Sequence, residues 1–156
     1  MTKNGIFDQN LTKMNANESD YIIKEVKTVF DELSKNSEEA QLNSFLSCYD
    51  NSPVFIHFSA DGKMRNYEEF KKICGEYCTT LKQQKLSTIT EKFTVVDTNL
   101  VIVGWTGNIT AQFKNGDVMI MKEYSITNVY KKENDKWKIV HSHESSLPPE
   151  IQQSKT

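Results

Sequence analysis

The sequence predicts an α+β fold in which three helices pack inside a strongly curved, mainly antiparallel sheet. Apolar residues recur at helical spacing in the first half of the chain, and from Leu86 onward their period changes to two. Short turns separate the later segments, and Asn115-Gly116 is the strongest hairpin signal. Such turns make neighbouring strands antiparallel, and long antiparallel strands twist. We therefore expect the curved sheet to wrap around the three helices and to enclose part of a cavity.

Each of the three helices is predicted from an apolar stripe along one face. The first is expected over about 17–35, and the second follows at once over about 36–49. The third begins after Asn66, which has a glutamate three residues further on and so forms a capping pair. A short strand over 54–58 and a brief partner strand over 64–66 lie between the second and third helices.

Four long strands are predicted in the second half of the chain, at 86–97, 100–113, 118–132 and 136–146. Together with the helices they make one domain over 17–147, because the chain has no internal repeat and no linker of biased composition. The polar segments outside it are expected to be a flexible arm over 1–16 and a frayed tail over 148–156.

The composition excludes several classes of function. The 156 residues include 19 basic and 21 acidic side chains, a net charge of −2, so the chain lacks the basic field on which nucleic-acid binding depends. No apolar run reaches the roughly 20 residues of a membrane span. We expect no nucleic-acid or membrane partner and a cytoplasmic location, with a cleaved signal peptide as the alternative.

The three cysteines do not predict a disulfide framework, because their number is odd. Cys74 and Cys78 lie four residues apart on the third predicted helix, and no second pair completes a zinc site. We interpret them as small apolar residues on a buried helical face and expect no metal and no cofactor.

The order of elements and the closing segment Lys136-Trp137-Lys138-Ile139-Val140-His141-Ser142-His143-Glu144-Ser145 resemble the nuclear transport factor 2-like superfamily. The similarity is greatest to its SnoaL-like group and to the association domain of calcium/calmodulin-dependent protein kinase II, over about 19–147. The resemblance implies a cone-shaped α+β barrel with an open-ended pocket, and dimers or larger rings formed through the outer face of the sheet. It does not name an activity, because the superfamily hosts several.

Alternation along the strands divides their residues between two faces. On 118–132 the more aromatic face is expected to point inward. On 136–146 the resemblance implies that Val140, Ser142 and Glu144 point inward. On 100–113 the inward face is expected to carry Asn108, which leaves an apolar row on the outer face. That row is either a subunit interface or a sign that the assignment is inverted. The expected interface residues are Val103, Trp105, Ile109, His141 and His143.

Alignment with the kinase association domain, whose pocket is lined with arginines, gives Asn108, Asn128 and Glu144 at the matching positions. Two amides and a carboxylate do not attract an anion as arginines do, so a neutral or cationic ligand is expected. The residues expected to contact that ligand are Phe30, Tyr49, Phe55, Asn108, Tyr124, Ile126, Asn128, Ser142 and Glu144.

His57 lies on the first strand, where the ketosteroid isomerase branch of the superfamily carries its catalytic aspartate. Histidine titrates near neutral pH, so His57 is a candidate general base, with Tyr124 or Glu144 assisting. The alternative is a histidine that only donates or accepts a hydrogen bond in a polar cavity. His141 and His143 share a face, but Glu144 points the other way, so the three do not form a metal site.

These observations favour a self-associating domain that binds a small, mostly neutral molecule in an aromatic pocket. An isomerase, dehydratase or cyclase with His57 as base is the first alternative. A pure association module is the second.

Overall fold

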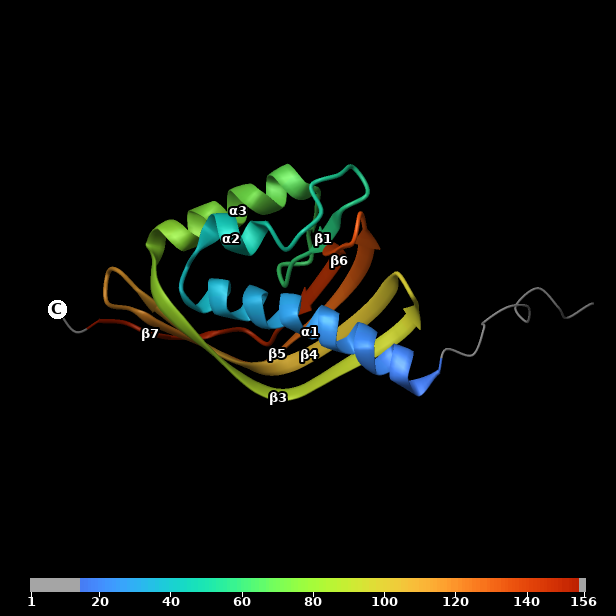
Figure 1. Cartoon of the computed structure of the whole chain (residues 1–156). Coiled ribbons are helices and arrows are strands. Elements are labelled where there is room, and N and C mark those ends of the chain that lie inside the picture. Colours follow the sequence, from blue (N-terminus) through green and yellow to red (C-terminus); the bar gives the residue numbers. More distant parts are fainter. Residues whose placement is uncertain (1–14, 155–156) are drawn as a thin grey trace, which may run out of the picture.

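The computed structural model describes residues 15–154, which form an α+β fold with three helices on the concave side of a strongly curved sheet (Figure 1). The helices are α1 (Ala16–Glu38), α2 (Leu42–Leu46) and α3 (Tyr67–Thr80). The strands are β1 (Ile56–Phe58), β2 (Met64–Arg65), β3 (Leu81–Asp97), β4 (Leu100–Phe113), β5 (Val118–Glu133), β6 (Lys136–Ser145) and β7 (Glu150–Gln152). No helix in this part of the chain is long and apolar enough to cross a membrane.

The bounds of the first two helices differ from those that the sequence predicted. Asn15 caps α1, because its side chain accepts a hydrogen bond from the Glu18 amide at 2.8 Å. The helix then continues three residues beyond the predicted end, to Glu38. Ala40 takes a positive φ of 53°, which turns the chain, and α2 is a single short helix rather than the predicted span of 36–49.

The third helix has the predicted start. Asn66 and Glu69 form a capping box, with both reciprocal hydrogen bonds at 3.0 Å. Strand β3 follows directly from the end of α3 at Leu81, five residues before the predicted strand. The helix and the longest strand are therefore joined without a loop, which fixes α3 over the sheet.

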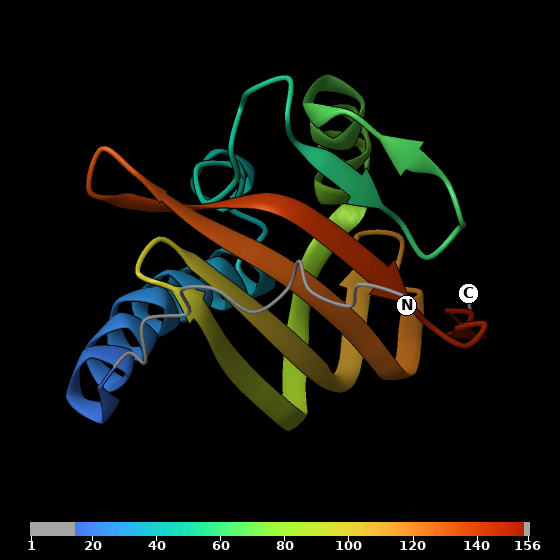
Figure 2. The same cartoon turned by 90° about the vertical axis from the view of Figure 1, so that its right-hand side faces the viewer.

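The sheet is open and mixed, with the order β2-β1-β6-β5-β4-β3. Most neighbours are antiparallel, as predicted, but β1 and β6 run parallel because they are far apart in the chain. The strands curl around the helices, and the two edges of the sheet remain apart (Figure 2). The frayed tail expected over 148–156 is partly ordered instead, because β7 pairs with the start of β5. The expected arm over 1–16 lies almost wholly outside the described residues.

Bulges decide which residues face the helices. Glu123 has a positive φ of 51°, and the register between β4 and β5 shifts at this point. As a result Met119 and Met121 share the inward face with Tyr124. The alternation expected for 118–132 is therefore wrong for the first part of β5. Val140 is the extra residue of a second bulge, where the β5–β6 register shifts, so it is not one of the inward set.

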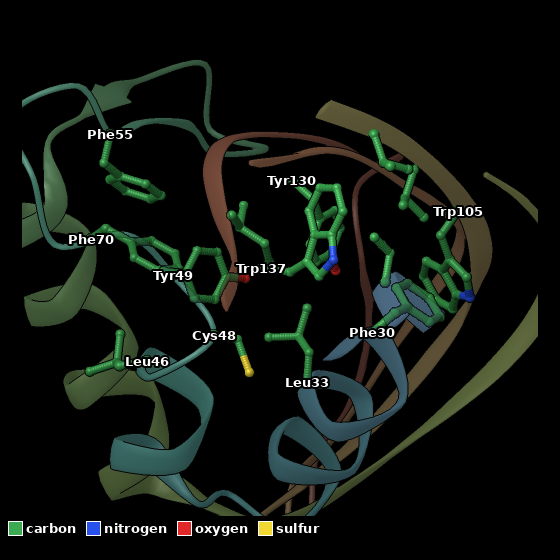
Figure 3. Packing of buried hydrophobic residues seen from close by; sticks show 14 of the residues in the cluster. Phe30, Leu33, Leu46, Cys48, Tyr49, Phe55, Phe70, Trp105, Tyr130 and Trp137 are labelled. Carbon is green, nitrogen blue, oxygen red and sulfur yellow. The ribbon is translucent and has the colours of Figure 1, made fainter. Parts of the chain in front are cut away.

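The inward face of β4 is also the opposite of the expected one. In the antiparallel register Val103 lies opposite Asn128 and Trp105 opposite Ile126, and residues opposite one another share a face. Val103 and Trp105 are accordingly buried. Figure 3 shows Trp105 of β4 beside Phe30 of α1, with Tyr49, Phe55 and Phe70 on the other side of the core.

Candidate functional site

A cavity of about 520 Å³ lies between α3, α1 and the concave face of the sheet. Its wall is largely apolar and aromatic, with Phe30 from α1, Phe70 from α3, Trp105 from β4 and Tyr124 from β5. The volume falls within the range of ordinary small-molecule sites. Polar side chains gather where β1, β2 and β6 meet.

Strand register explains why these polar groups are neighbours. His57 of β1 lies opposite Arg65 of β2 on one side and opposite Ser142 of β6 on the other. Glu144 is two residues beyond Ser142 and so points to the same face. The His57 Nε2 and Glu144 Oε2 atoms are 3.8 Å apart. A histidine and a carboxyl group that are 87 residues apart in the chain thus meet in one cavity wall.

Burial shifts both groups toward their neutral forms. Loss of water and, to a smaller extent, the positive charge of Arg65 together lower the pKa of His57 to about 4. The same loss of water raises the pKa of Glu144 to about 7, although hydrogen bonding to Tyr124 opposes the shift. At neutral pH the histidine is uncharged and the carboxyl group is close to its midpoint.

Arg65 is a site residue that the sequence analysis missed. It is the only cation in the cavity wall among residues 15–154, and its side chain is only 13% exposed. Its guanidinium donates to both carboxylate oxygens of Asp61, at 3.0 and 2.6 Å, and to Ser59 Oγ at 2.6 Å. The alignment with the kinase association domain did not identify this cation, whose charge is paired with that of Asp61.

Six of the nine residues expected to contact a ligand line the cavity, namely Phe30, Tyr49, Tyr124, Ile126, Asn128 and Glu144, and so does His57, the candidate base. Three do not. Phe55 is buried in the core behind Tyr49, with ring centroids 5.8 Å apart. Ser142 is buried beside His57 without reaching the cavity. Asn108 accepts a hydrogen bond from the Glu123 amide at 3.1 Å, so it supports the bulge in β5 instead.

The expected interface residues separate into two groups. Val103, Trp105 and Ile109 line the cavity, so the apolar row of β4 covers the interior and not a partner. This resolves the alternative left open above, because the assignment of faces on β4 is inverted. His141 and His143 lie on the opposite face of β6 from Glu144, against the Phe58 ring at 5.9 and 5.5 Å between centroids.

The cysteines take part in packing. Cys74 lines the cavity, where burial raises the pKa of its thiol well above the usual value. A thiol held in its neutral form is a poor nucleophile and a poor metal ligand. Within residues 15–154 no three histidine, cysteine or acidic side chains are grouped so that they could hold a metal ion.

Comparison with protein-family models gives a match to the SnoaL-like domain over residues 26–149, most of the chain. The chain belongs to the SnoaL-like family. Solved structures similar to the SnoaL-like chain share its fold across nearly their whole length, although the sequences have diverged widely. No curated protein matches the chain in a sequence search.

Three of these structures show the range of the fold. A nuclear transport factor 2-like protein from Salmonella enterica is 18% identical, with a TM-score of 0.73 and coverage of 88% of this chain and 95% of that one. A protein titled as a candidate scytalone dehydratase, from Novosphingobium aromaticivorans, is 7% identical (TM-score 0.75; coverage 90% and 94%). The LinA-type3 hexachlorocyclohexane dehydrochlorinase of Novosphingobium barchaimii is 6% identical (TM-score 0.72; coverage 88% and 94%). The SnoaL-like chain therefore has the nuclear transport factor 2-like fold.

Proposed function

We propose that the SnoaL-like cavity binds a small, largely apolar and uncharged molecule. The observation that carries this proposal is a cavity of about 520 Å³ with aromatic walls and a cluster of convergent polar side chains where β1, β2 and β6 meet. The aromatic wall supplies affinity through burial of apolar surface, and the polar cluster fixes the orientation of the ligand.

The charges at the polar end favour a neutral ligand. Arg65 is already engaged by Asp61 through two hydrogen bonds, so it has little net charge to offer an anion. A carboxylate ligand would also meet Glu144, whose burial already disfavours its own ionised form. A neutral hydroxyl group can donate a hydrogen bond to the Tyr124 oxygen or to Glu144 without these costs.

Binding can be tested with 4-hydroxystilbene, a fluorescent, flat and mostly apolar probe. We expect saturable binding to the wild-type chain and weaker binding to Ile126→Trp, because Ile126 lines the cavity and the larger indole takes up space there. Thr127→Trp is the matched control, since Thr127 is exposed on the other face of β5. Urea denaturation establishes that both variants are folded. Equal binding by the two variants would refute a cavity site.

Proton transfer on the bound molecule is a second candidate function, favoured by the Glu144–His57 pair. A general base works best when its pKa lies near the working pH, and Glu144 meets that condition at about 7. His57, with a pKa of about 4, is the weaker base. The roles expected from the sequence are therefore exchanged in this proposal, with Glu144 as the base, and His57 and Tyr124 positioning the substrate.

The names of the similar structures give this candidate a direction. A dehydratase and a dehydrochlorinase both remove a proton and a leaving group from neighbouring carbon atoms. Screening the wild-type chain with hydroxyketones and cyclic alcohols for loss of water, or for exchange of carbon-bound hydrogen in heavy water, tests it. We expect Glu144→Gln to reduce turnover at least a hundredfold. If the wild-type chain binds the stilbene probe but turns over no compound, the proton-transfer function is refuted and the binding function stands.

Self-association stays a proposal that rests on the family resemblance. With Val103, Trp105 and Ile109 inside the cavity, the surface left for a second copy is the outer face of β4 to β6. That face carries His141, His143 and the partly exposed Ile102. Light scattering that gives a monomer mass at high concentration would contradict it.

A further inference from the structure

The cavity has a second polar end, at the opposite end of α3 from Arg65. Arg65 stands just before the first residue of α3, whereas Tyr77 is in its last turn and Gln84 follows in β3. The 14 residues of α3 span about 21 Å at 1.5 Å per residue. Figure 1 shows β1 near one end of α3 and the start of β3 at the other. The cavity, lined at both ends, is therefore elongated along the helix.

Three neutral side chains form this second end, and each lines the cavity. The Tyr77 hydroxyl donates to Gln84 Oε1 at 2.9 Å. Gln84 Nε2 in turn donates to Ser37 Oγ at 2.6 Å and to the Ser37 carbonyl oxygen at 3.0 Å. The network joins the end of α1, the end of α3 and the start of β3, so its atoms are held in place before any ligand arrives.

The network leaves hydrogen-bonding capacity that faces the cavity. Both Gln84 amide hydrogens are used, but the hydrogen of the Ser37 hydroxyl has no acceptor among the described residues. The Tyr77 oxygen donates one bond and still has lone pairs to accept another. Burial raises the pKa of Tyr77 to about 12, so its hydroxyl stays protonated. A ligand hydroxyl could both accept from Ser37 and donate to Tyr77.

We infer that Ser37, Tyr77 and Gln84 form a second ligand subsite, so that the cavity selects an elongated apolar molecule with a neutral oxygen group at each end. This inference deepens the proposed function and rests on it. One end group meets Glu144 and His57, and the other meets Ser37 and Tyr77. An anionic end group is disfavoured here, because the Glu38 carboxylate, which accepts from the Leu86 amide at 2.7 Å, lies next to Ser37 in α1.

The test compares 4-hydroxystilbene with 4,4′-dihydroxystilbene, which differ by one terminal hydroxyl. We expect the dihydroxy probe to bind the wild-type chain about tenfold more tightly, the effect of one well-placed buried hydrogen bond. In Tyr77→Phe and in Ser37→Ala this advantage should shrink to about twofold, because each variant removes one hydrogen-bond partner of the second hydroxyl.

Tyr67→Phe is the matched control. Tyr67 lies in the first turn of α3 and packs against Phe55 with ring centroids 5.8 Å apart, outside the cavity wall. It should keep the full advantage of the dihydroxy probe. Both Tyr→Phe changes keep the ring, so folding is preserved, and Tyr77 keeps its contact with Phe113.

The possible results separate this inference from the proposed function. Equal wild-type affinities for the two probes would overturn the second subsite and leave the cavity site standing. An advantage that persists in both Tyr77→Phe and Ser37→Ala would also overturn it. If the wild-type chain binds neither probe, both the second subsite and the proposed function fail.

Discussion

The Nε2 atom of His57 and the Oε2 atom of Glu144 face each other across 3.8 Å in the cavity wall. This separation exceeds a hydrogen bond, so the two side chains are neighbours without a direct bond between them. His57 is almost fully buried, and the Glu144 side chain is 23% exposed. Because burial penalises any charge, the pair is neutral at mildly acidic pH, and the first charge to develop as pH rises is that of Glu144.

This arrangement predicts a pH-dependent cost to stability. A carboxyl group whose pKa rises on folding, here from 4.5 to about 7, binds its proton more tightly in the folded state. The free energy of unfolding therefore falls as pH rises from about 4.5 to 7 and then levels off. Glu144→Gln removes this dependence. The free energy of unfolding of the variant minus that of wild type should therefore be larger at pH 8 than at pH 5, by up to about 3 kcal/mol.

Urea denaturation of both proteins at pH 5 and pH 8 measures the difference. His57 does not affect the comparison of the two proteins, because its pKa is lowered in both. In each protein, its contribution to the free energy of unfolding rises with pH between about 4 and 6.5. A difference between wild type and Glu144→Gln that is the same at both pH values would show that the Glu144 pKa is not raised.

Arg65 should influence the pKa of Glu144. Its positive charge lowers the pKa of Glu144, so Arg65→Met is expected to raise that pKa above 7. Infrared difference spectra during a pH titration follow the protonated carboxyl band directly. Lys63→Met removes an exposed charge from the same hairpin and should leave the midpoint in place. A midpoint that moves down in Arg65→Met would contradict the placement of the guanidinium.

Gly107 should tolerate no side chain. A Cβ atom there would overlap Cζ2 of Trp105 and would lie 2.5 Å from the Ser87 carbonyl oxygen. Gly107→Ala must therefore displace the indole from the cavity wall, at a cost of about 1–3 kcal/mol. Gly104→Ala is the matched control in the same strand, because no atom lies within 4 Å of its added Cβ. Equal melting temperatures for the two variants in thermal unfolding would contradict this packing.

Asn108 should affect stability and not ligand binding. Its side-chain oxygen accepts from the Glu123 amide in the bulge of β5, where Glu123 takes a positive φ. We expect Asn108→Ala to lower the free energy of unfolding by about 1 kcal/mol. Its affinity for 4-hydroxystilbene should match the wild-type value. A loss of affinity with unchanged stability would contradict this prediction and indicate that Asn108 contacts the ligand.

The architecture could be predicted from the sequence because it depends on signals that act locally. The capping box at Asn66, the hairpin at Asn115-Gly116 and the change of apolar period each come from a few consecutive residues. The closing segment 136–145 carried the resemblance to the superfamily, and the family match and the shared fold confirm that resemblance.

The inner faces of the strands could not be predicted in the same way, because one bulge exchanges the two faces. Glu123 shows no sequence signal of a positive φ, which glycine or asparagine would have given. Arg65 was missed for a related reason. It belongs to a strand of only two residues, and its place beside His57 depends on the pairing of β1 with β2.

Titration of the Glu144 carboxyl carbon by carbon-13 NMR tests the central claim most directly, because that claim is a carboxyl group held neutral beside His57 in an apolar cavity. We predict one carboxyl resonance with a midpoint near pH 7, and this resonance is absent from Glu144→Gln. A midpoint near 4.5, the ordinary value for a solvated glutamate, would contradict both the burial of Glu144 and its role as a base.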